Sequence, residues 1–329
     1  MSNVLVVGGA GYIGGVTTDE LLAAGHAVRV YDGLLYEERY LKPVDFIYGD
    51  IRDRARLKPH LDWADSVVWL AGLVGDGACS LNPQLTEEIN VRSVRSLVRN
   101  FNRRIVFMST CSVYGAQDGV LDENSPSNPL SLYAKTKLEA EKIVADAEAI
   151  SFRLGTLFGL GDTYSRIRMD LVLNALTAKA CLYKKISVYG GEQYRALLHV
   201  RDVATAVVPN VTSSHKGICN LHVQNAKIAE LADRIAEHLP GVQVQWTELK
   251  FQDARSYKVS SDKARKMFGF SPKFTIDDGI EEIKTLTEEG RIRDLSSARY
   301  SNTDFLRPIL MPKSSPLGYE VTPPVWDTG

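Results

Sequence analysis

The sequence predicts an α/β protein: a Rossmann-type doubly wound parallel sheet followed by a smaller C-terminal α/β lobe. Three observations support this prediction. The chain opens with an apolar strand at Val4–Val7 that runs into a glycine-rich turn, apolar strands then alternate with amphipathic helices as far as Leu154, and the pattern loosens after that residue. Short apolar strands of this kind are typical of parallel sheets that helices cover on both faces. A chain of 329 residues is long enough for two lobes that share a cleft.

The predicted elements follow the alternation in chain order. In the first half we expect strands at Val4–Val7, Ala27–Tyr31, Asp45–Tyr48, Ser66–Leu70, Ile105–Met108 and Ser151–Leu154, with a first helix that ends at Ala24 and later helices at Gln84–Phe101 and Ser131–Ala147. In the second half we expect a helix around Leu171–Lys179, strands at Ile186–Tyr189 and Arg195–Val200, a helix at Ile228–Leu239, a strand at Val242–Trp246 and a last helix at Asp277–Glu288.

The turn after the first strand carries Gly8, Gly9, Gly11 and Gly14, which fit both G-x-x-G-x-x-G and G-x-G-x-x-G. Backbone amides in such a turn can approach a pyrophosphate, so the pattern predicts a dinucleotide site rather than a turn without a ligand. Asp32 follows at the tip of the second strand, where the ribose hydroxyls of the dinucleotide are expected. Because this carboxylate repels a 2′-phosphate and no Lys or Arg stands between Asp32 and Arg39, the sequence favours NAD over NADP.

A second pattern concerns catalysis. Tyr133 and Lys137 stand four residues apart, which places them on one face of a helix. An ammonium group beside a phenol lowers the pKa of that phenol, so Tyr133 is suited to act as a general base towards an alcohol. The helix follows a strand that ends near Thr110, at the sheet edge where open α/β sheets bind ligands. Thr110 is expected to hydrogen-bond the same alcohol oxygen.

Composition excludes several classes of function. A formal charge of −1 and an isoelectric point of about 6.6 provide no basic field for nucleic acid. The longest apolar stretches fall short of the ~20 residues of a membrane span. Cys79, Cys111, Cys181 and Cys219 lack C-x-x-C spacing, no cluster has zinc spacing, and the start of the chain lacks the pattern of a secretory leader. We therefore expect a cytoplasmic protein with reduced thiols and no metal.

Several segments point in the same direction when they are taken together. They are Gly8–Gly14, Gly49–Ile51, Leu70–Gly72, Asn90–Val91, Ser109–Gly115, Tyr133–Lys137, Arg153–Gly159 and Leu198–Val203. With these segments the chain resembles the extended short-chain dehydrogenase/reductase family, the nucleotide-sugar epimerases and dehydratases, over about residues 1–290.

The resemblance implies a role for each residue that matches a family motif. It implies that Thr110, Tyr133 and Lys137 are catalytic. It implies that NAD contacts Gly8, Gly11, Tyr12, Ile13, Gly14, Asp32, Asp50, Ile51, Leu70, Ala71, Gly72, Tyr133 and Lys137. On the substrate side it points to Val74, Cys111, Ser112, Arg166, Arg168, Asn174, Arg195 and Arg255. Arg195 and Arg255 are expected to hold the diphosphate of a nucleotide sugar, because guanidinium groups bind phosphate bidentately, and surface ion pairing is the alternative. The resemblance also implies a homodimer through the helices Gln84–Phe101 and Ser131–Ala147.

The departures from the family pattern bear on the reaction. Dehydratases of the family carry an acidic pair directly after the catalytic Thr, whereas this chain has Cys111 and Ser112, so elimination of water is disfavoured. Cys111 is expected to be either a small buried apolar side chain or a proton donor. Trp69 stands where many members carry His, and together with the segments Leu70–Gly75, Arg153–Gly159 and Ser165–Leu171 it makes the chain look most like a subgroup that includes GDP-mannoheptose 4-dehydrogenases. Arg166 and Arg168 are expected to reach phosphate or to pair with nearby acids.

These interpretations predict the domain organisation. We expect residues 1–165 to form the NAD-binding domain, with 190–213 returning to it, and residues 166–189 and 214–298 to form the substrate-binding lobe. The tail at 299–329 contains several prolines, so we expect an extended arm that lies on the body or on a partner, or a disordered tail. These prolines are Pro308, Pro312, Pro316, Pro323 and Pro324.

The predicted function is an NAD-dependent oxidoreductase or epimerase that acts on a nucleotide-diphosphate sugar. The hydride leaves a ring carbon, carbon 4 in the first instance, while Tyr133 takes the hydroxyl proton. The alternatives are a 4-ketoreductase, a 4,6-dehydratase and a non-catalytic NAD-binding sensor, and the Tyr133–Lys137 pair counts against the sensor. The sequence leaves the nucleotide base and the final product open.

Overall fold

The computed structural model describes residues 1–37, 39–247 and 255–311. Its largest sheet has seven strands, and every neighbouring pair in it is parallel. The strand order is β11 (Gly217–Leu221), β7 (Ala149–Leu154), β5 (Arg104–Thr110), β4 (Ser66–Trp69), β1 (Asn3–Val7), β2 (Ala27–Asp32) and β3 (Asp45–Tyr48). The predicted doubly wound parallel sheet is confirmed.

The strand order reverses between β1 and β4, since the chain winds outward from β1 in one direction and then crosses back to continue from β4 in the other. The carboxyl ends of these two strands therefore face a crevice, because the crossovers on either side of the reversal leave in opposite directions. Val7 at the end of β1 pairs with Trp69 at the end of β4. The residues that follow both strands are thus brought to one place.

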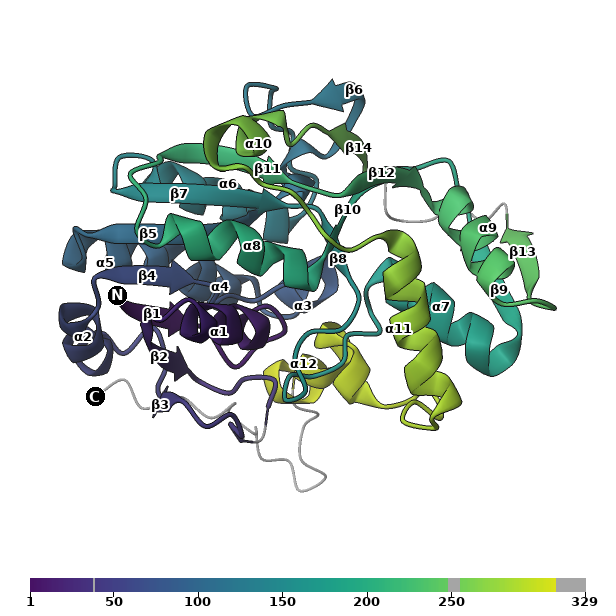
Figure 1. Ribbon diagram of the computed structural model, residues 1–329, viewed down its shortest axis with the longest axis horizontal. Helices are drawn as coiled ribbons and strands as arrows, with labels where there is room; N and C mark the ends of the chain where they lie inside the picture. Colours follow the sequence, from purple (N-terminus) through teal and green to yellow (C-terminus); the bar gives the residue numbers. More distant parts are fainter. Residues whose placement is uncertain (38, 248–254, 312–329) are drawn as a thin grey trace.

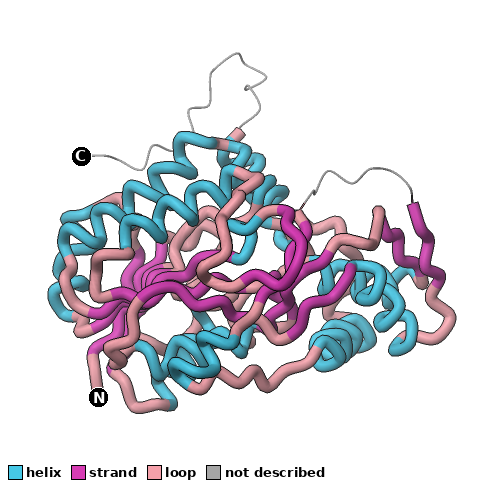
Figure 2. Tube along the Cα trace, turned by 90° about the horizontal axis from the view of Figure 1, so that it is seen from above, coloured by secondary structure: helices cyan, strands magenta, loops and turns pink. Residues whose placement is uncertain are grey.

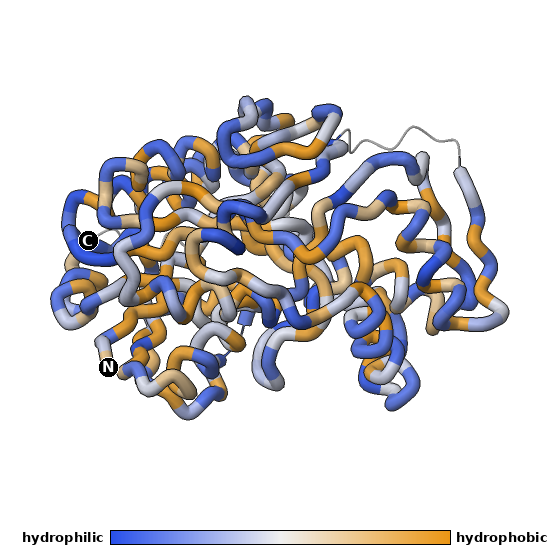
Figure 3. Tube along the Cα trace, turned by 45° about the horizontal axis from the view of Figure 1, so that its top comes forward, coloured by the Kyte–Doolittle hydropathy of each residue, from blue (hydrophilic) through white to orange (hydrophobic). Residues whose placement is uncertain are grey.

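Helices cover both faces of this sheet, as Figure 2 shows from above. On one face α1 (Gly14–Ala23) packs beside α8 (Val200–Asn210), and on the other lie α2 (Arg54–Trp63), α5 (Ser93–Asn100) and α6 (Leu132–Val144). Alternate residues of β1 supply the two cores, with Val4 and Val6 on the α1 side and Leu5 and Val7 on the α5 side. Figure 3 shows the hydrophobic stretches running through the strands between these layers.

The helix predicted at Gln84–Phe101 is broken into three parts. They are α4 (Pro83–Glu87), a π-helical turn η1 (Glu88–Arg92) and α5. Asn90 lies in the wider turn, where its side chain accepts a hydrogen bond from Leu73 N at 2.8 Å and donates one to Leu73 O at 2.9 Å. The π turn thus fixes the loop after β4, which is consistent with the frequent place of such turns at functional sites.

The smaller lobe lies at the other side of the molecule (Figure 1). Its apolar core is formed by α7 (Val172–Tyr183), α9 (Ile228–His238), α11 (Ile276–Glu288) and the parallel pair β9 (Lys185–Tyr189) and β13 (Gln243–Thr247). A three-stranded sheet connects the lobes through β8 (Thr156–Phe158), β10 (Tyr194–His199) and β12 (Gln224–Lys227), and β6 (Ala116–Leu121) pairs with β14 (Ser256–Val259). The domain boundaries stay a prediction, although β11 joins the main sheet from beyond residue 214. α10 (Asp262–Phe268) packs near β11.

The chain after residue 298 is not extended where the structure describes it. It forms a short 3-10 turn, η3 (Ala298–Tyr300), and then helix α12 (Asn302–Leu310). The side chain of Ser301 caps this helix by accepting a hydrogen bond from Asp304 N at 3.2 Å, and Leu306 is fully buried among Leu73 and its neighbours. The cap and the buried leucine stabilise a helix despite Pro308. Pro312, Pro316, Pro323 and Pro324 lie outside the described residues.

None of the helices in the described ranges combines the length and the apolar composition that a bilayer crossing requires.

Candidate active site

A cavity of about 1050 Å³ opens at the carboxyl edge of the large sheet. It begins at the glycine-rich turn after β1, passes the ends of β4 and β5, and continues to β9 and α9 of the smaller lobe. All thirteen residues expected to bind NAD line it: Gly8, Gly11, Tyr12, Ile13, Gly14, Asp32, Asp50, Ile51, Leu70, Ala71, Gly72, Tyr133 and Lys137. One continuous space therefore links the expected cofactor and substrate regions.

The glycine-rich turn leaves no room for side chains at two positions. Gly8 has a φ of +85°, and a Cβ there would lie 2.4 Å from the backbone nitrogen of Ala71. A Cβ at Gly14 would lie 2.5 Å from the backbone of Gly9, where α1 meets the turn. Both positions therefore require glycine. The bare backbone beside the start of α1 fits a dinucleotide pyrophosphate.

Asp32 lies at the end of β2 and supports the same turn. One carboxylate oxygen accepts a hydrogen bond from Ala10 N at 3.0 Å and the other accepts one from Leu34 N at 2.7 Å. Burial raises the pKa of Asp32, although both hydrogen bonds oppose the rise.

Asp50 and Ile51 follow β3 at the same edge of the sheet. Asp50 forms a 2.6 Å ion pair with Arg52, a cavity residue that the sequence analysis did not single out.

Thr110, Tyr133 and Lys137 meet in the middle of the cavity. Thr110 ends β5, and Tyr133 lies in the first turn of α6, whose capping residue Ser131 accepts a hydrogen bond from Ala134 N at 3.2 Å. Lys137 is one turn further along α6, and its Nζ donates a hydrogen bond to Met108 O at 3.0 Å. Burial lowers the pKa of Lys137 to about 8. The helix and the strand thus hold the three side chains together.

The pKa of Tyr133 differs from the sequence-based expectation. Burial raises this pKa well above its usual range, the charges of Cys79 and Asp76 raise it further, and the hydrogen bond with Thr110 lowers it. Lys137 is not among the largest influences on this pKa, and its Nζ donates a hydrogen bond to Met108 O. The phenol is therefore held in its protonated form by the protein alone.

A buried ion pair anchors the catalytic helix from behind. Glu141 of α6 accepts hydrogen bonds from Arg153 of β7 at 3.0 and 2.7 Å, and it also accepts one from Ser109 of β5. Arg153 donates a further bond to the Tyr114 hydroxyl at 2.9 Å. Since all these groups are buried and paired, the position of α6 relative to β5 and β7 is fixed.

Arg195 and Arg255 line the far part of the cavity, but Arg255 also reaches towards the catalytic end. Its Nη1 lies 3.0 Å from a carboxylate oxygen of Asp76 and 3.3 Å from Ser112 Oγ. Arg195 donates hydrogen bonds to the Tyr194 and Arg255 carbonyls. Asp76 is a functional candidate that the sequence analysis missed, because only the fold brings it to Arg255. Its other carboxylate oxygen is buried and has no hydrogen-bond partner among the residues that the structure describes.

Arg166 and Arg168 both line the cavity, and both are held by neighbours. Arg168 forms a 2.6 Å ion pair with Asp170, which agrees with the expected alternative of pairing with nearby acids. Arg166 donates hydrogen bonds to the Arg299 carbonyl and to Asn302. Val74 and Ser112 line the cavity as well.

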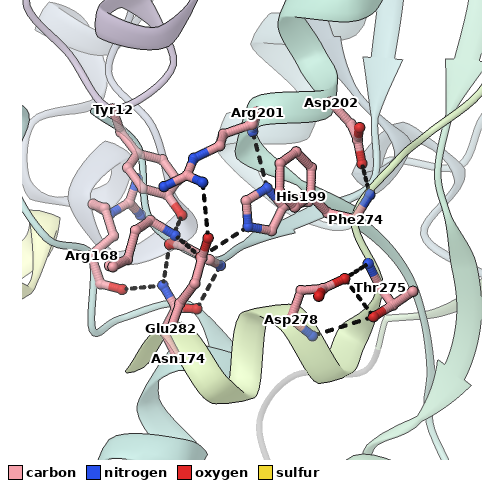
Figure 4. A network of polar contacts seen from close by, with 12 residues as sticks. Tyr12, Arg168, Asn174, His199, Arg201, Asp202, Phe274, Thr275, Asp278 and Glu282 are labelled. Carbon is pink, nitrogen blue, oxygen red and sulfur yellow. Dashed lines mark hydrogen bonds and ion pairs between the residues drawn. The ribbon is translucent and has the colours of Figure 1, made fainter. Parts of the chain in front are cut away.

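Two predicted substrate residues do not reach the cavity. Asn174 is fully buried and accepts a hydrogen bond from Gly159 N at 2.9 Å, so it fixes a loop (Figure 4). Cys111 is also fully buried, its Sγ lies 3.2 Å from Arg153 O, and burial raises the pKa of its thiol. Cys111 therefore matches the buried apolar alternative and not the proton donor. His199 does not line the cavity either: it stacks on Phe274 at 4.3 Å and lies 3.0 Å from Glu282, which is a structural role.

The chain matches known proteins over most of its length. A family model described as "NAD dependent epimerase/dehydratase family" matches residues 4–221. The UDP-glucose 4-epimerase of Rhizobium meliloti (strain 1021) is 28% identical over 308 aligned positions, which cover 84% of this chain and 94% of the relative. The UDP-glucose 4-epimerase of Lacticaseibacillus casei is also 28% identical, over 85% of this chain and 94% of the relative. Among solved structures, MoeE5 in complex with UDP-glucuronic acid and NAD has a TM-score of 0.74 at 27% identity, covering 88% of this chain and 99% of that one.

Proposed function

The chain belongs to the NAD dependent epimerase/dehydratase family, and we propose that it oxidises carbon 4 of a nucleotide-diphosphate sugar with Tyr133 as the general base. The observation that carries the proposal is the meeting of Thr110, Tyr133 and Lys137 in the cavity that begins at the glycine-rich turn. NAD, when bound, accepts the hydride from the sugar and can return it. The family and its relatives support NAD as the cofactor.

We assign the cofactor to the residues that frame its expected path. Gly8, Gly11, Tyr12, Ile13 and Gly14 would surround the pyrophosphate, and Asp32 would hold the ribose. Asp50 and Ile51 would flank the adenine, while Leu70, Ala71 and Gly72 would form the wall near the nicotinamide. The close packing at Gly8 and the supported position of Asp32 favour this assignment.

The proton step falls to Tyr133. Its phenol must release a proton before it can accept one from the sugar hydroxyl, and burial opposes this release. A positive charge near the phenol favours the ionised form. We assign that charge to Lys137, whose hydrogen bond to Met108 keeps the ammonium in the cavity, and we assign Thr110 to the hydroxyl of the same sugar carbon.

The substrate class is a sugar attached to a nucleoside diphosphate. UDP-glucose is the first candidate, because the matched relatives are UDP-glucose 4-epimerases. A GDP-mannoheptose is the finer alternative indicated by the segments around Leu70 and Arg166. Arg195 and Arg255 are assigned to the diphosphate, and Val74, Ser112, Arg166 and Arg168 to the remaining wall.

A 4,6-dehydratase is the second candidate, and Asp76 favours it. The cavity holds this carboxylate near Tyr133, although the two residues directly after Thr110 are not acidic. Incubation of the protein with NAD and with UDP-glucose or GDP-mannose, followed by chromatographic separation and mass spectrometry of the sugar nucleotides, distinguishes the candidates. A separated isomer of equal mass supports epimerisation, loss of two hydrogen atoms with reduction of NAD supports simple oxidation, and loss of one water supports elimination. No change with any sugar nucleotide contradicts both.

The domain division stated from the sequence, a homodimer and a cytoplasmic location complete the proposal. The homodimer rests on the family resemblance alone. The helices expected at its interface, α5 and α6, do not expose an apolar face: their exposed residues are mostly charged and include Arg95 and Glu139, which pair at 3.2 Å. All four cysteines carry free thiols, which supports a reducing compartment.

A further inference from the structure

Helix α12 forms part of the cavity wall, although it lies outside the residues that the family model matches. Asn302, Thr303, Ile309 and Leu310 of this helix line the cavity. Figure 1 shows α12 beside α3 (Asp76–Leu81), between the large sheet and α11. The C-terminal segment therefore completes a space that the rest of the chain leaves open on this side.

The start of α12 is fixed by hydrogen bonds to two other walls of the cavity. The side-chain nitrogen of Asn302 donates a bond to Val74 O at 3.0 Å, in the loop after β4. The backbone nitrogen of Asn302 donates a bond to Asp170 at 2.9 Å, and its side-chain oxygen accepts one from Arg166. Asn302 is only 3% exposed. Its side-chain amide thus helps to hold the helix and Arg166 in place.

Apolar packing brings α12 to the catalytic end. Leu306 is fully buried with Leu73, Ala78 and Cys79, and Tyr133 packs against the same cluster. Arg166 lies over the rings of Tyr36 and Phe305, at 4.8 and 5.8 Å from their centroids. The wall formed by α12 therefore faces the region where the sugar must lie if Tyr133 is to reach its hydroxyl.

One contact sets the distance between α12 and α3. A Cβ built on Gly77 would lie 2.5 Å from Thr303 Oγ1, 3.2 Å from Thr303 Cγ2 and 3.4 Å from Thr303 Cβ. Any side chain at Gly77 must displace the Thr303 Oγ1 and crowd its Cγ2 at the start of α12. Gly77 has no positive φ, so alanine is compatible with its backbone and the effect of a substitution is steric.

We infer that α12 is part of the substrate site and that the Gly77–Thr303 contact determines the size of the sugar pocket. The inference rests on the proposed function and deepens it, because it assigns the sugar selectivity to a C-terminal helix. The nucleotide and the cofactor are assigned to other residues of the cavity wall, so we expect crowding at Thr303 to weaken binding of the sugar part most.

Calorimetric titration of the NAD-loaded protein tests this inference with UDP-glucose, UDP, GDP-mannose and GDP as the probes. In Gly77→Ala we expect the sugar nucleotide that the wild type binds to bind about tenfold more weakly, and the matching nucleotide and NAD to change less than about twofold. Gly77→Ala combined with Thr303→Ala restores sugar-nucleotide binding, because the nearest remaining contact is then 3.4 Å.

Arg307→Ala is the matched control, since Arg307 lies on the outer side of the same helix. We expect Arg307→Ala to bind UDP-glucose, UDP, GDP-mannose and GDP with the same affinities as the wild type. The inference is overturned if Gly77→Ala weakens nucleotide and sugar nucleotide equally, weakens NAD instead, has no effect, or is not rescued by Thr303→Ala. A wild type that binds NAD but none of the four probes overturns the proposed function itself, and the inference with it.

Discussion

The ammonium nitrogen of Lys137 donates a hydrogen bond to the carbonyl oxygen of Met108 at 3.0 Å. This bond connects the catalytic helix α6 to strand β5 at Met108, two residues before Thr110 at the end of the strand. Lys137 is buried, and a Cβ built on Gly72 would lie 3.5 Å from its Nζ. The single lysine therefore contacts the strand that carries Thr110 and faces the loop expected beside the nicotinamide.

Replacement of this lysine tests its double role. In Lys137→Met we expect kcat to fall by at least about a hundredfold, because the charge that favours ionisation of Tyr133 is lost. NAD binding weakens as well, since the ammonium group lies in the cofactor part of the cavity. Steady-state kinetics and fluorescence titration of NAD measure the two effects. Lys135→Met, on the exposed side of the same helix, keeps both values, and equal behaviour of the two variants contradicts the assignment.

The cofactor preference depends on Asp32. We expect the wild type to bind NADP at least about tenfold more weakly than NAD, because the carboxylate repels a 2′-phosphate. Asp32→Ala reduces this preference and also lowers stability, since Ala10 N and Leu34 N lose their acceptor. Titration of both proteins with each cofactor checks the preference. Tighter NADP binding by the wild type is incompatible with the account.

Acid sensitivity should have one identifiable source in His222. Burial lowers the pKa of His222 to about 4, and its Nδ1 lies 2.6 Å from Ser261 Oγ. The unfolded chain has an ordinary pKa near ~6.5 at this residue, so it binds more protons than the folded protein between these values. The neutral imidazole of His222 therefore contributes fully to the free energy of unfolding above about pH 6.5. This contribution decreases as the pH falls, and the loss reaches about 2 kcal/mol at pH 5.

His222→Gln removes this titration without a change of charge at neutral pH. Urea unfolding at pH 7 and pH 5 measures the free energy of unfolding for both proteins. We expect a smaller loss between the two pH values in the variant than in the wild type. Identical losses mean that His222 is not the acid-sensitive group.

Much of the fold could be predicted because parallel strands have a strong signature. β3 begins and ends where the sequence predicted, and β1, β2 and β4 differ by one residue at one end. Helix α2 was missed because its exposed surface is large, only Leu57 and Leu61 mark its buried side, and Pro59 in its middle argues against a helix in the sequence. The π turn at Glu88–Arg92 has no signal in residue spacing, and its Asn90 contacts Leu73, which is remote in the sequence.

The residues of the candidate site likewise include some that could be predicted from the sequence and some that could not. Residues at the carboxyl ends of parallel strands, such as Asp32 and Thr110, were predictable because these strand ends meet at one edge of the sheet. Asp76 and Asn302 were not, since they reach the cavity through contacts with Arg255 and Val74 that are remote in sequence. Asn174 was misassigned because a polar residue on a helix near the cavity looks the same in sequence whether it faces a ligand or a loop.

The oligomeric state tests the family-based proposal of a homodimer. Sedimentation at micromolar concentration should give the mass of two chains of 36.4 kDa. The interface is expected to include the charged exposed residues of α5 and α6, so Arg95→Glu should shift the equilibrium towards the monomer. A wild type that sediments only as a monomer rules the dimer out.

The most direct measurement follows a deuterium label on carbon 4 of UDP-glucose, or of the sugar nucleotide that the protein converts, during one turnover in ordinary water. Equimolar NAD-loaded protein is quenched, and mass spectrometry locates the label on sugar and cofactor. Hydride transfer at carbon 4 predicts that the deuterium stays on carbon 4 of the product or moves to the nicotinamide, and that Tyr133→Phe, which keeps the fold, moves almost none. Loss of the label to water, its appearance on carbon 6 together with loss of water, or normal transfer by Tyr133→Phe contradicts the account.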